Sequence, residues 1–375
     1  MRQSAGGCPG GRRKSLATQF KPAYYELPEF VRAAGPAYPE IRYGRYPALG
    51  QNTGDMGTAL EIAMSLTEPR SDAAAHASTS LKITLPTLQE KKRNRVPISA
   101  LTAYDYAMAR LVDEASVDLI LVGDSLGMVM LGYESTLPVT MGEMLLCTRA
   151  VRRGVRRALL AADMPYASYH EDVQQGVRNA LRFVKEAGAE AVKVEGGRNR
   201  IELVSRLTDA EISVIGHLGL TPQSLHRMGG YRVQGKTLSA AEHLLEDAVA
   251  LEAAGAALLV LEGVPREVAA SITAELTIPT IGIGAGPECD GQILVLHDLL
   301  NLSFAPAAKF VRRYGDAASL IRNAVEAYRK DVETGDFPND AESYHLCAET
   351  RGTFARATAT RATVAPAAIR QPRKA

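Results

Sequence analysis

Six charged or polar residues stand at or next to the carboxyl ends of short apolar stretches in the middle of the chain. They are Asp124, Asp163, Lys193, Glu195, His217 and Glu262. In "AVKVEGG" (191–197), Lys193 and Glu195 alternate with valines, and because strand side chains alternate faces, the two charges point the same way. Any one of the six could be a helix cap or a hydrogen-bonded core residue. Charged residues are rarely buried without a partner or a metal, so the same placement in five successive stretches predicts an active site.

The residue types indicate metal-assisted chemistry on an anionic substrate. Asp124, Asp163 and Glu195 would repel one another without a cation, and hard divalent ions such as Mg²⁺, or Mn²⁺ and Co²⁺ on the same oxygens, prefer carboxylate ligands. Lys193 adds positive charge for a substrate anion, which suits a 2-oxo acid whose carboxylate and carbonyl can chelate the ion. A polarised carbonyl makes the neighbouring C–H acidic, and Glu262, set in apolar "LLVLEGV", is the candidate general base. These residues predict enolate chemistry and leave the electrophile open.

Eight short apolar stretches are predicted to be the strands that position these side chains. They are "PISALTAYD", "DLILVGD", "ALLAADMP", "AVKVEGG", "ISVIGHLG", "ALLVLEGV", "PTIGIGAG" and "QILVLHD". Helical segments lie between most of them, with capping boxes expected at Thr140–Glu143, Ser168–Glu171 and Ser239–Glu242 and helix ends at Gly188 and Gly255. Alternating strands and helices with nearly continuous apolar strands predict a parallel sheet covered by helices.

A (β/α)8 TIM barrel over residues 81–345 accounts best for this pattern. The number of strands and the length both match that fold, in which catalytic residues lie at the carboxyl ends of the strands. A doubly wound open sheet is the alternative. That fold would carry a glycine fingerprint after its first strand, whereas "TAYDYAMAR" has none and "GIGAG" occurs only after the seventh.

Composition and the chain ends set further limits. Lys plus Arg (43) nearly balance Asp plus Glu (42), and this even charge argues against a nucleic-acid partner. The four cysteines are not spaced as in a metal site or a disulfide framework. No apolar run reaches the length of a membrane span, and no signal-peptide core is evident, so we expect a cytoplasmic protein. Residues 1–80, rich in Pro, Gly and Tyr, are expected to be disordered, to be a targeting segment, or to precede a true start at Met56 or Met64. Residues 346–375 are expected to be a disordered tail.

Several strings resemble the ketopantoate hydroxymethyltransferase family. They are "TAYDY", "LVGDSLGMVMLGYESTLPVT", "AADMPY", "VKVEGG", "GHLGLTPQS", "GGYRVQG", "LVLEGVP", "IGIGAGPECDGQILVLHD" and "FPNDAESYH". The resemblance implies a TIM barrel of the phosphoenolpyruvate mutase and isocitrate lyase type, assembled as a homo-oligomer, a decamer. It also implies transfer of a hydroxymethyl group from 5,10-methylenetetrahydrofolate to 3-methyl-2-oxobutanoate, giving 2-dehydropantoate for pantothenate biosynthesis.

The resemblance further implies a role for each site residue. Asp124 and Asp163 would be Mg²⁺ ligands that also contact the substrate, and Glu195 would be a third metal-site carboxylate, bound directly or through water. Ser125 and Lys193 would contact the substrate's carboxylate and carbonyl. Glu262 would accept the C3 proton, and His217 would assist near the substrate. The loop "LTPQSLHRMGGYRVQG" is expected to cover the folate site.

Two other functions stay open. One is a Mg²⁺-dependent lyase or mutase of the same barrel group, although the nucleophilic-cysteine loop usual in its lyases has no counterpart here. The other is a non-catalytic scaffold, although all five acidic and basic residues of the proposed site are intact. Folate dependence would separate the first from a hydroxymethyltransferase.

Overall fold

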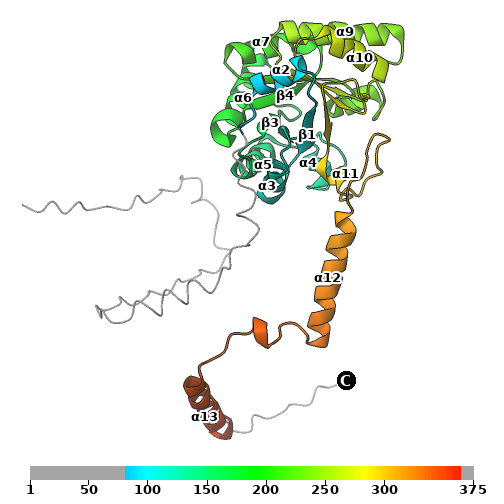
Figure 1. The fold of residues 1–375 in the computed structure, drawn as a ribbon. Helices are drawn as coiled ribbons and strands as arrows, with labels where there is room; N and C mark the ends of the chain where they lie inside the picture. Colours follow the sequence, from blue (N-terminus) through cyan, green and yellow to red (C-terminus); the bar gives the residue numbers. More distant parts are fainter. Residues whose placement is uncertain (1–80, 365–375) are drawn as a thin grey trace, which may run out of the picture. The chain divides into compact units, whose positions relative to one another are not determined.

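The computed structural model describes residues 81–364, and the predicted (β/α)8 barrel is confirmed (Figure 1). Eight strands occur at the eight predicted stretches. They are β1 (Ile98–Thr102), β2 (Leu119–Val122), β3 (Leu159–Asp163), β4 (Ala191–Glu195), β5 (Val214–Gly219), β6 (Leu258–Glu262), β7 (Thr280–Ile283) and β8 (Gly291–Leu294). All neighbours are parallel, and β1 pairs with both β2 and β8, which closes the barrel. The expectations for residues 1–80 and 365–375 lie outside the described residues.

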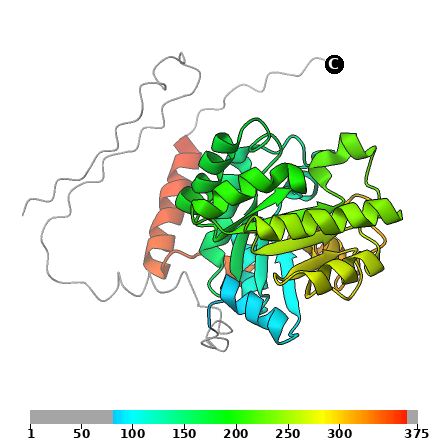
Figure 2. The same cartoon turned by 90° about the horizontal axis from the view of Figure 1, so that it is seen from above.

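Helices follow most of the strands and lie around them, as the view in Figure 2 shows. The α-helices are α2 (Leu85–Arg93), α3 (Tyr106–Glu114), α4 (Leu126–Val129), α5 (Met141–Gly154), α6 (Val173–Ala187), α7 (Ile201–Asp209), α8 (Leu225–Met228), α9 (Leu238–Ala253), α10 (Arg266–Glu275), α11 (Leu296–Leu299), α12 (Ala317–Thr334) and α13 (Ala348–Val364). Short 3-10 turns add η3 (Arg198–Arg200), η4 (Pro222–Ser224) and η5 (Asp340–Glu342). Among the described residues, none of these helices has both the length and the apolar character that crossing a membrane requires.

The helix starts were predicted with mixed success. The capping box of α5 is confirmed, since Thr140 accepts from the Glu143 backbone and Glu143 bonds back to Thr140. The other two boxes are wrong. Helix α6 is capped by Asp172 rather than Ser168, and α9 by Thr237 rather than Ser239. In both cases another good capping side chain stood nearby, and the sequence pattern alone does not rank such neighbours.

The interior of the barrel is apolar below its mouth. Ala191, Ile215, Leu258 and Val260 belong to the cluster of buried residues inside the strands. Because side chains alternate, the next inward positions along these strands are Lys193 and Glu195 on β4, His217 on β5 and Glu262 on β6. The strand period therefore brings the polar residues together at the carboxyl ends, above a packed apolar plug.

The segment from Lys82 to Arg93 closes the opposite end of the barrel. Lys91 pairs with Asp118 (2.7 Å), just before β2, and Lys92 pairs with Asp290 (2.9 Å), just before β8. Leu88 of α2 is completely buried and belongs to the cluster inside the strands. This segment thereby ties the amino ends of distant strands to one helix.

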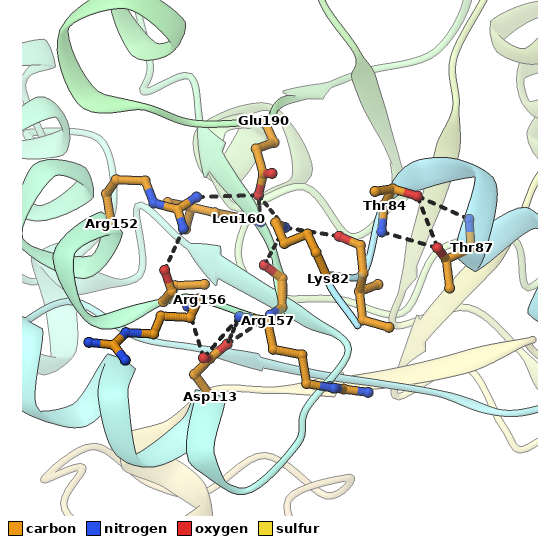
Figure 3. Close-up of polar contacts among 12 residues, drawn as sticks. Lys82, Thr84, Thr87, Asp113, Arg152, Arg156, Arg157, Leu160 and Glu190 are labelled. Atoms are coloured by element: carbon orange, nitrogen blue, oxygen red, sulfur yellow. Dashed lines mark hydrogen bonds and ion pairs between the residues drawn. The ribbon is translucent and has the colours of Figure 1, made fainter. Parts of the chain in front are cut away.

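Figure 3 shows the polar contacts that continue this closure across the ends of β3 and β4. The Glu190 carboxylate accepts from Lys82 (2.8 Å) and from the backbone N–H of Leu160 (2.9 Å). Asp113, at the end of α3, accepts the backbone N–H groups of Arg156 and Arg157 at 2.9–3.1 Å. The carboxylates at this end are thus bound by backbone donors and by lysine and arginine side chains, and these contacts stabilise the fold.

The carboxyl-terminal segment differs from the expectation. A disordered tail was expected over residues 346–375, but residues 348–364 form helix α13. Alanine is the best helix former, and this stretch is rich in it. The low sequence complexity hid that helical preference.

Candidate active site

The residues singled out from the sequence meet at the carboxyl ends of β2 to β6. Lys193 lies at the centre, with its Nζ 3.3 Å from Asp163 Oδ1, 3.4 Å from Glu195 Oε1 and 3.0 Å from His217 Nδ1. His217 Nδ1 is 3.2 Å from Glu195 Oε1, and its Nε2 is 3.3 Å from Glu262 Oε2. The strand register places these groups side by side, since Asp163 pairs with Lys193, and Glu195 with His217.

Asp124 and Asp163 form the acidic side of the site. The backbone N–H of Asp124 donates to Asp163 Oδ2 (3.0 Å), while the buried Asp163 Oδ1 accepts no hydrogen bond among the described residues. Burial and the neighbouring carboxylates Asp163 and Glu195 raise the pKa of Asp124 well above its ordinary value. Burial also raises the pKa of Asp163, and Lys193 opposes that effect. Two close, buried carboxylates of this kind are destabilised as anions unless a cation lies between them.

Lys193 and Glu195 hold each other in the charged state. Burial alone would raise the pKa of Glu195, but Lys193 and the hydrogen bond with His217 lower it to about 2. Burial would lower the pKa of Lys193, and the carboxylates of Asp163 and Glu195 reverse that and raise it. Both side chains are about 95% buried, so the ammonium group of Lys193 is held in a fixed position inside the mouth.

Glu262 is the most open carboxylate of the group. Its side chain is 17% exposed, against 4% for Glu195. His217 lies between the two, and although burial and Lys193 lower the pKa of His217, the hydrogen bonds with Glu195 and Glu262 raise it overall. Glu262 therefore faces the mouth of the barrel, and its contact with the more deeply buried His217 fixes its position.

Ser125 has a partner that the sequence did not predict. Ser125 precedes α4, and its Oγ lies 2.9 Å from the hydroxyl of Tyr104, which follows β1. Tyr104 is almost completely buried, and burial raises the pKa of its hydroxyl. This contact orients the Ser125 hydroxyl beside Asp124.

Gln223 and Tyr169 were also missed. Gln223 Nε2 donates to Asp124 Oδ2 (2.9 Å), and its backbone N–H donates to Glu195 Oε2 (3.0 Å). The Tyr169 hydroxyl donates to Gln223 Oε1 (2.6 Å) and accepts from the Glu195 backbone N–H (3.1 Å). Both residues come from loops and carry no charge, so neither strand position nor charge identified them. The presence of Gln223 in "GHLGLTPQS" was the only available signal for that residue, and Tyr169 lies outside all of the strings quoted above.

The loop "LTPQSLHRMGGYRVQG", which was expected to cover the folate site, contacts other parts of the barrel mouth. The Tyr231 hydroxyl contacts Met128 Sδ (3.5 Å), and the backbone N–H of Gln234 donates to the carbonyl of Gly263 beside Glu262. A cavity of about 1160 Å³ lies beside Glu195, between this loop, the segment 196–200 and the start of α9. Arg198, Arg200 and Arg227 are among the residues that line it. Whether the loop covers a folate stays a prediction.

The donors of this site fit a hard divalent ion. The described residues contain no set of three His, Cys, Asp or Glu side chains spaced as ligands of one metal. Mg²⁺ needs fewer, because it keeps several waters and is usually bound by one or two carboxylates plus the substrate. Asp124 and Asp163 supply those carboxylates, and Asp163 Oδ1 accepts no hydrogen bond among the described residues, although Lys193 Nζ lies 3.3 Å away. Glu195 is engaged by Lys193, His217 and Gln223, which favours contact with an ion through water rather than directly.

The chain is similar in sequence to proteins that are named as one kind of enzyme. A family model for ketopantoate hydroxymethyltransferase matches residues 82–340. The 3-methyl-2-oxobutanoate hydroxymethyltransferase of Koribacter versatilis is 67% identical over 273 residues, covering 73% of this chain and 92% of that protein. The protein of the same name from Pelobacter propionicus is 53% identical over 264 residues, covering 70% and 98%.

Solved structures are more distant. A phosphonopyruvate hydrolase complex with oxalate and Mg²⁺ is 15% identical, with a TM-score of 0.46 over 75% of this chain and 99% of that one. A 2,3-dimethylmalate lyase, described as a member of the PEP mutase/isocitrate lyase superfamily, is 17% identical, with a TM-score of 0.46 over 73% and 98%. At these scores the likeness adds nothing to the topology described above.

Proposed function

The chain belongs to the ketopantoate hydroxymethyltransferase family, and we propose that it transfers a hydroxymethyl group from 5,10-methylenetetrahydrofolate to 3-methyl-2-oxobutanoate. The product is 2-dehydropantoate, on the route to pantothenate. The observation that carries the assignment is the convergence of Asp124, Asp163, Lys193, Glu195 and Glu262 at one barrel mouth.

The acidic side of the site is proposed to hold Mg²⁺, with Mn²⁺ or Co²⁺ as substitutes. Asp124 and Asp163 would be the protein ligands, with Glu195 acting through water. When bound there, the ion would draw electron density from the 2-oxo group and make the C3 proton more acidic. Asp124, Asp163, Ser125 and Lys193 surround the position of the substrate's carboxylate and carbonyl. Lys193, fixed between two carboxylates, supplies the positive charge for the substrate anion.

Glu262 is proposed to remove the C3 proton. Its carboxylate is the most open of the group, and the contact between His217 Nε2 and Glu262 Oε2 (3.3 Å) keeps it directed at the mouth. The carbanion that forms at C3 then attacks the methylene carbon of the folate, and a new carbon–carbon bond forms. The two carbon–nitrogen bonds of that methylene break, water supplies the hydroxyl group, and tetrahydrofolate leaves. General-base catalysis of this kind contributes about 10²–10⁴-fold in rate.

The remaining expectations are part of the same proposal. A lyase or mutase acting on another 2-oxo acid is not favoured, because the relatives named above carry the hydroxymethyltransferase name. Residues 81–345 are proposed as the catalytic domain, working in the cytoplasm as a homo-oligomer, a decamer. Folate and 3-methyl-2-oxobutanoate are the proposed small-molecule partners, without a nucleic-acid or membrane partner.

The first test is deuterium exchange at C3 of 3-methyl-2-oxobutanoate in D₂O with Mg²⁺ and without folate. Wild-type protein should exchange the proton, and Glu262→Gln should lose about 10²–10⁴-fold of the rate. Glu275→Gln, the same change at an exposed residue of α10, is the matched control and should exchange normally. Adding 5,10-methylenetetrahydrofolate should then yield 2-dehydropantoate.

One outcome would overturn the assignment, and another would overturn only the role of Glu262. One is a folded, Mg²⁺-loaded wild-type protein that exchanges no proton and forms no 2-dehydropantoate. The other concerns the base alone: if Glu262→Gln exchanges as fast as Glu275→Gln, another group removes the proton.

A further inference from the structure

Gln223 occupies an unusual position for a loop residue. It lies in η4, directly after β5, and is 94% buried at the mouth of the barrel. Its side-chain amide donates to Asp124 Oδ2 (2.9 Å) and to the backbone carbonyl of Met164 (3.0 Å). Its backbone N–H donates to Glu195 Oε2 (3.0 Å). One residue therefore contacts two of the carboxylates on the proposed metal side of the site.

The partners leave the amide only one orientation. The Met164 carbonyl oxygen can only accept, so the NH₂ group must face it and therefore also Asp124 Oδ2. The Tyr169 hydroxyl donates to Oε1 (2.6 Å), which matches that orientation. Four hydrogen bonds from loops and strand ends therefore fix the residue, and its function is to orient other groups rather than to react.

Gln223 is also one end of the loop of residues 220–236. At the other end of the loop, the backbone N–H of Gln234 donates to the Gly263 carbonyl (2.9 Å). Between these anchors the loop contains Gly229 and Gly230, whose φ angles are +65° and +113°. A β-carbon added at either glycine would meet no heavy atom within 4 Å. At these two glycines the loop thus makes few contacts, and it is held by its two ends and by the contact of Tyr231 with Met128.

We propose that Gln223 is a positioning residue that holds Asp124 and Glu195 in their metal-binding orientation and so couples metal binding to the seating of loop 220–236. The inference rests on the proposed metal site. Residues that orient metal ligands through hydrogen bonds typically contribute about 10–100-fold to metal affinity. Coupling is reciprocal: if a seated loop raises the affinity for the ion, the ion must favour the seated loop by the same factor.

The test compares Gln223→Met with Gln174→Met, the same substitution at an exposed position of α6. Binding of Mn²⁺, measured on the purified chain by electron paramagnetic resonance, should weaken by about 10–100-fold in Gln223→Met and stay unchanged in the control. Trypsin cleavage after Arg227 and Arg232, both exposed in the loop, is followed by mass spectrometry. Saturating Mn²⁺ should slow this cleavage in wild type and the control but not in Gln223→Met.

A second variant keeps the test valid if Gln223→Met fails to fold. Gln223→Asn keeps an uncharged amide but withdraws it by one methylene from Asp124 Oδ2 and the Met164 carbonyl, so it should also bind Mn²⁺ more weakly than wild type. Thermal unfolding without metal establishes that each variant is folded. If Gln223→Met does not fold, Gln223→Asn and the wild-type cleavage measurement take its place in the test.

Three results would overturn the proposal. They are equal Mn²⁺ affinity in Gln223→Met and Gln174→Met, loop cleavage in wild type that does not respond to Mn²⁺, and a wild-type chain that binds no Mn²⁺. None of these measurements uses hydroxymethyl transfer. A chain that shows the coupling but forms no 2-dehydropantoate would therefore refute the proposed reaction alone.

Discussion

Replacing Lys193 by Met should destabilise the metal-free protein severely. Lys193 Nζ lies 3.3 Å from Asp163 Oδ1 and 3.4 Å from Glu195 Oε1, inside a mouth where all three side chains are about 95% buried. At an effective dielectric constant of about 20, each of these pairs is worth about 5 kcal/mol before the cost of burying the ammonium is subtracted. Removing one partner of a buried ion pair leaves the other uncompensated and typically costs about 3–5 kcal/mol.

The lowered pKa of Glu195 gives a second estimate of the stability lost in Lys193→Met. Its pKa of about 2, against an ordinary 4.5, corresponds to about 3 kcal/mol of stability at neutral pH, and Lys193 is the largest contributor to the lowering. Both estimates give a decrease of about 3 kcal/mol or more in the free energy of unfolding. For a barrel of this size that should lower the midpoint of thermal unfolding by roughly 10 °C.

The assay is urea and thermal unfolding at pH 7 with a chelator present, so that no ion replaces the missing charge. Lys185→Met, the same change at an exposed residue of α6, is the control and should shift the free energy of unfolding by less than about 0.5 kcal/mol. If Lys193→Met and Lys185→Met differ by less than about 1 kcal/mol, Lys193 does not compensate the two buried carboxylates and the reasoning fails.

Three further predictions concern groups around the site and at the opposite end of the barrel. Tyr104→Phe removes the hydrogen bond to Ser125, so KM for the 2-oxo acid should rise by up to about 10-fold with little change in thermal stability, and an unchanged KM would exclude a substrate contact through Ser125. Gly219→Ala places a β-carbon against the Glu262 carbonyl oxygen at a φ of +91°, so it should cost about 1–3 kcal/mol in unfolding measurements and slow C3 exchange by displacing the base. Normal C3 exchange would contradict this. Burial raises the pKa of Asp118, but hydrogen bonds from a lysine and a serine outweigh it and hold that pKa below 3.8. The stabilisation is therefore present at neutral pH and lost as the pH falls below about 4. Asp118→Asn should be less stable than wild type at pH 7, with a gap that narrows in acid, and a gap independent of pH would refute the ion pairing.

The strands and the charged site residues could be predicted because both follow from a simple period. Each buried strand is a short apolar run, and the alternation of "AVKVE" and "LLVLE" places Lys193, Glu195 and Glu262 on the inner face. The apolar runs gave the count of eight, and the absence of an early glycine fingerprint favoured a closed barrel. Closure itself depends on the pairing of β1 with β8, which no local pattern encodes.

Three neutral residues of the site could not be predicted, for a physical reason. Tyr104, Tyr169 and Gln223 act through hydrogen bonds that form only when separate loops meet. A tyrosine or glutamine in a loop has no charge whose burial demands an explanation, whereas a buried lysine does. The helix starts at Asp172 and Thr237 were misplaced for a similar reason, because tertiary packing chose between neighbouring residues that all cap well.

The closure of the barrel by α2 has a consequence for which sequence changes the protein can accept during evolution. Lys91 and Lys92 bind Asp118 and Asp290 at the amino ends of the strands, while every proposed reactive group lies at the carboxyl ends. Insertions and exchanges in the loops at the mouth leave those ion pairs and the plug around Leu88 untouched. Laboratory evolution of a new substrate preference should therefore tolerate longer loops at the mouth, and the same insertions placed between Lys82 and Arg93 should abolish expression of folded protein.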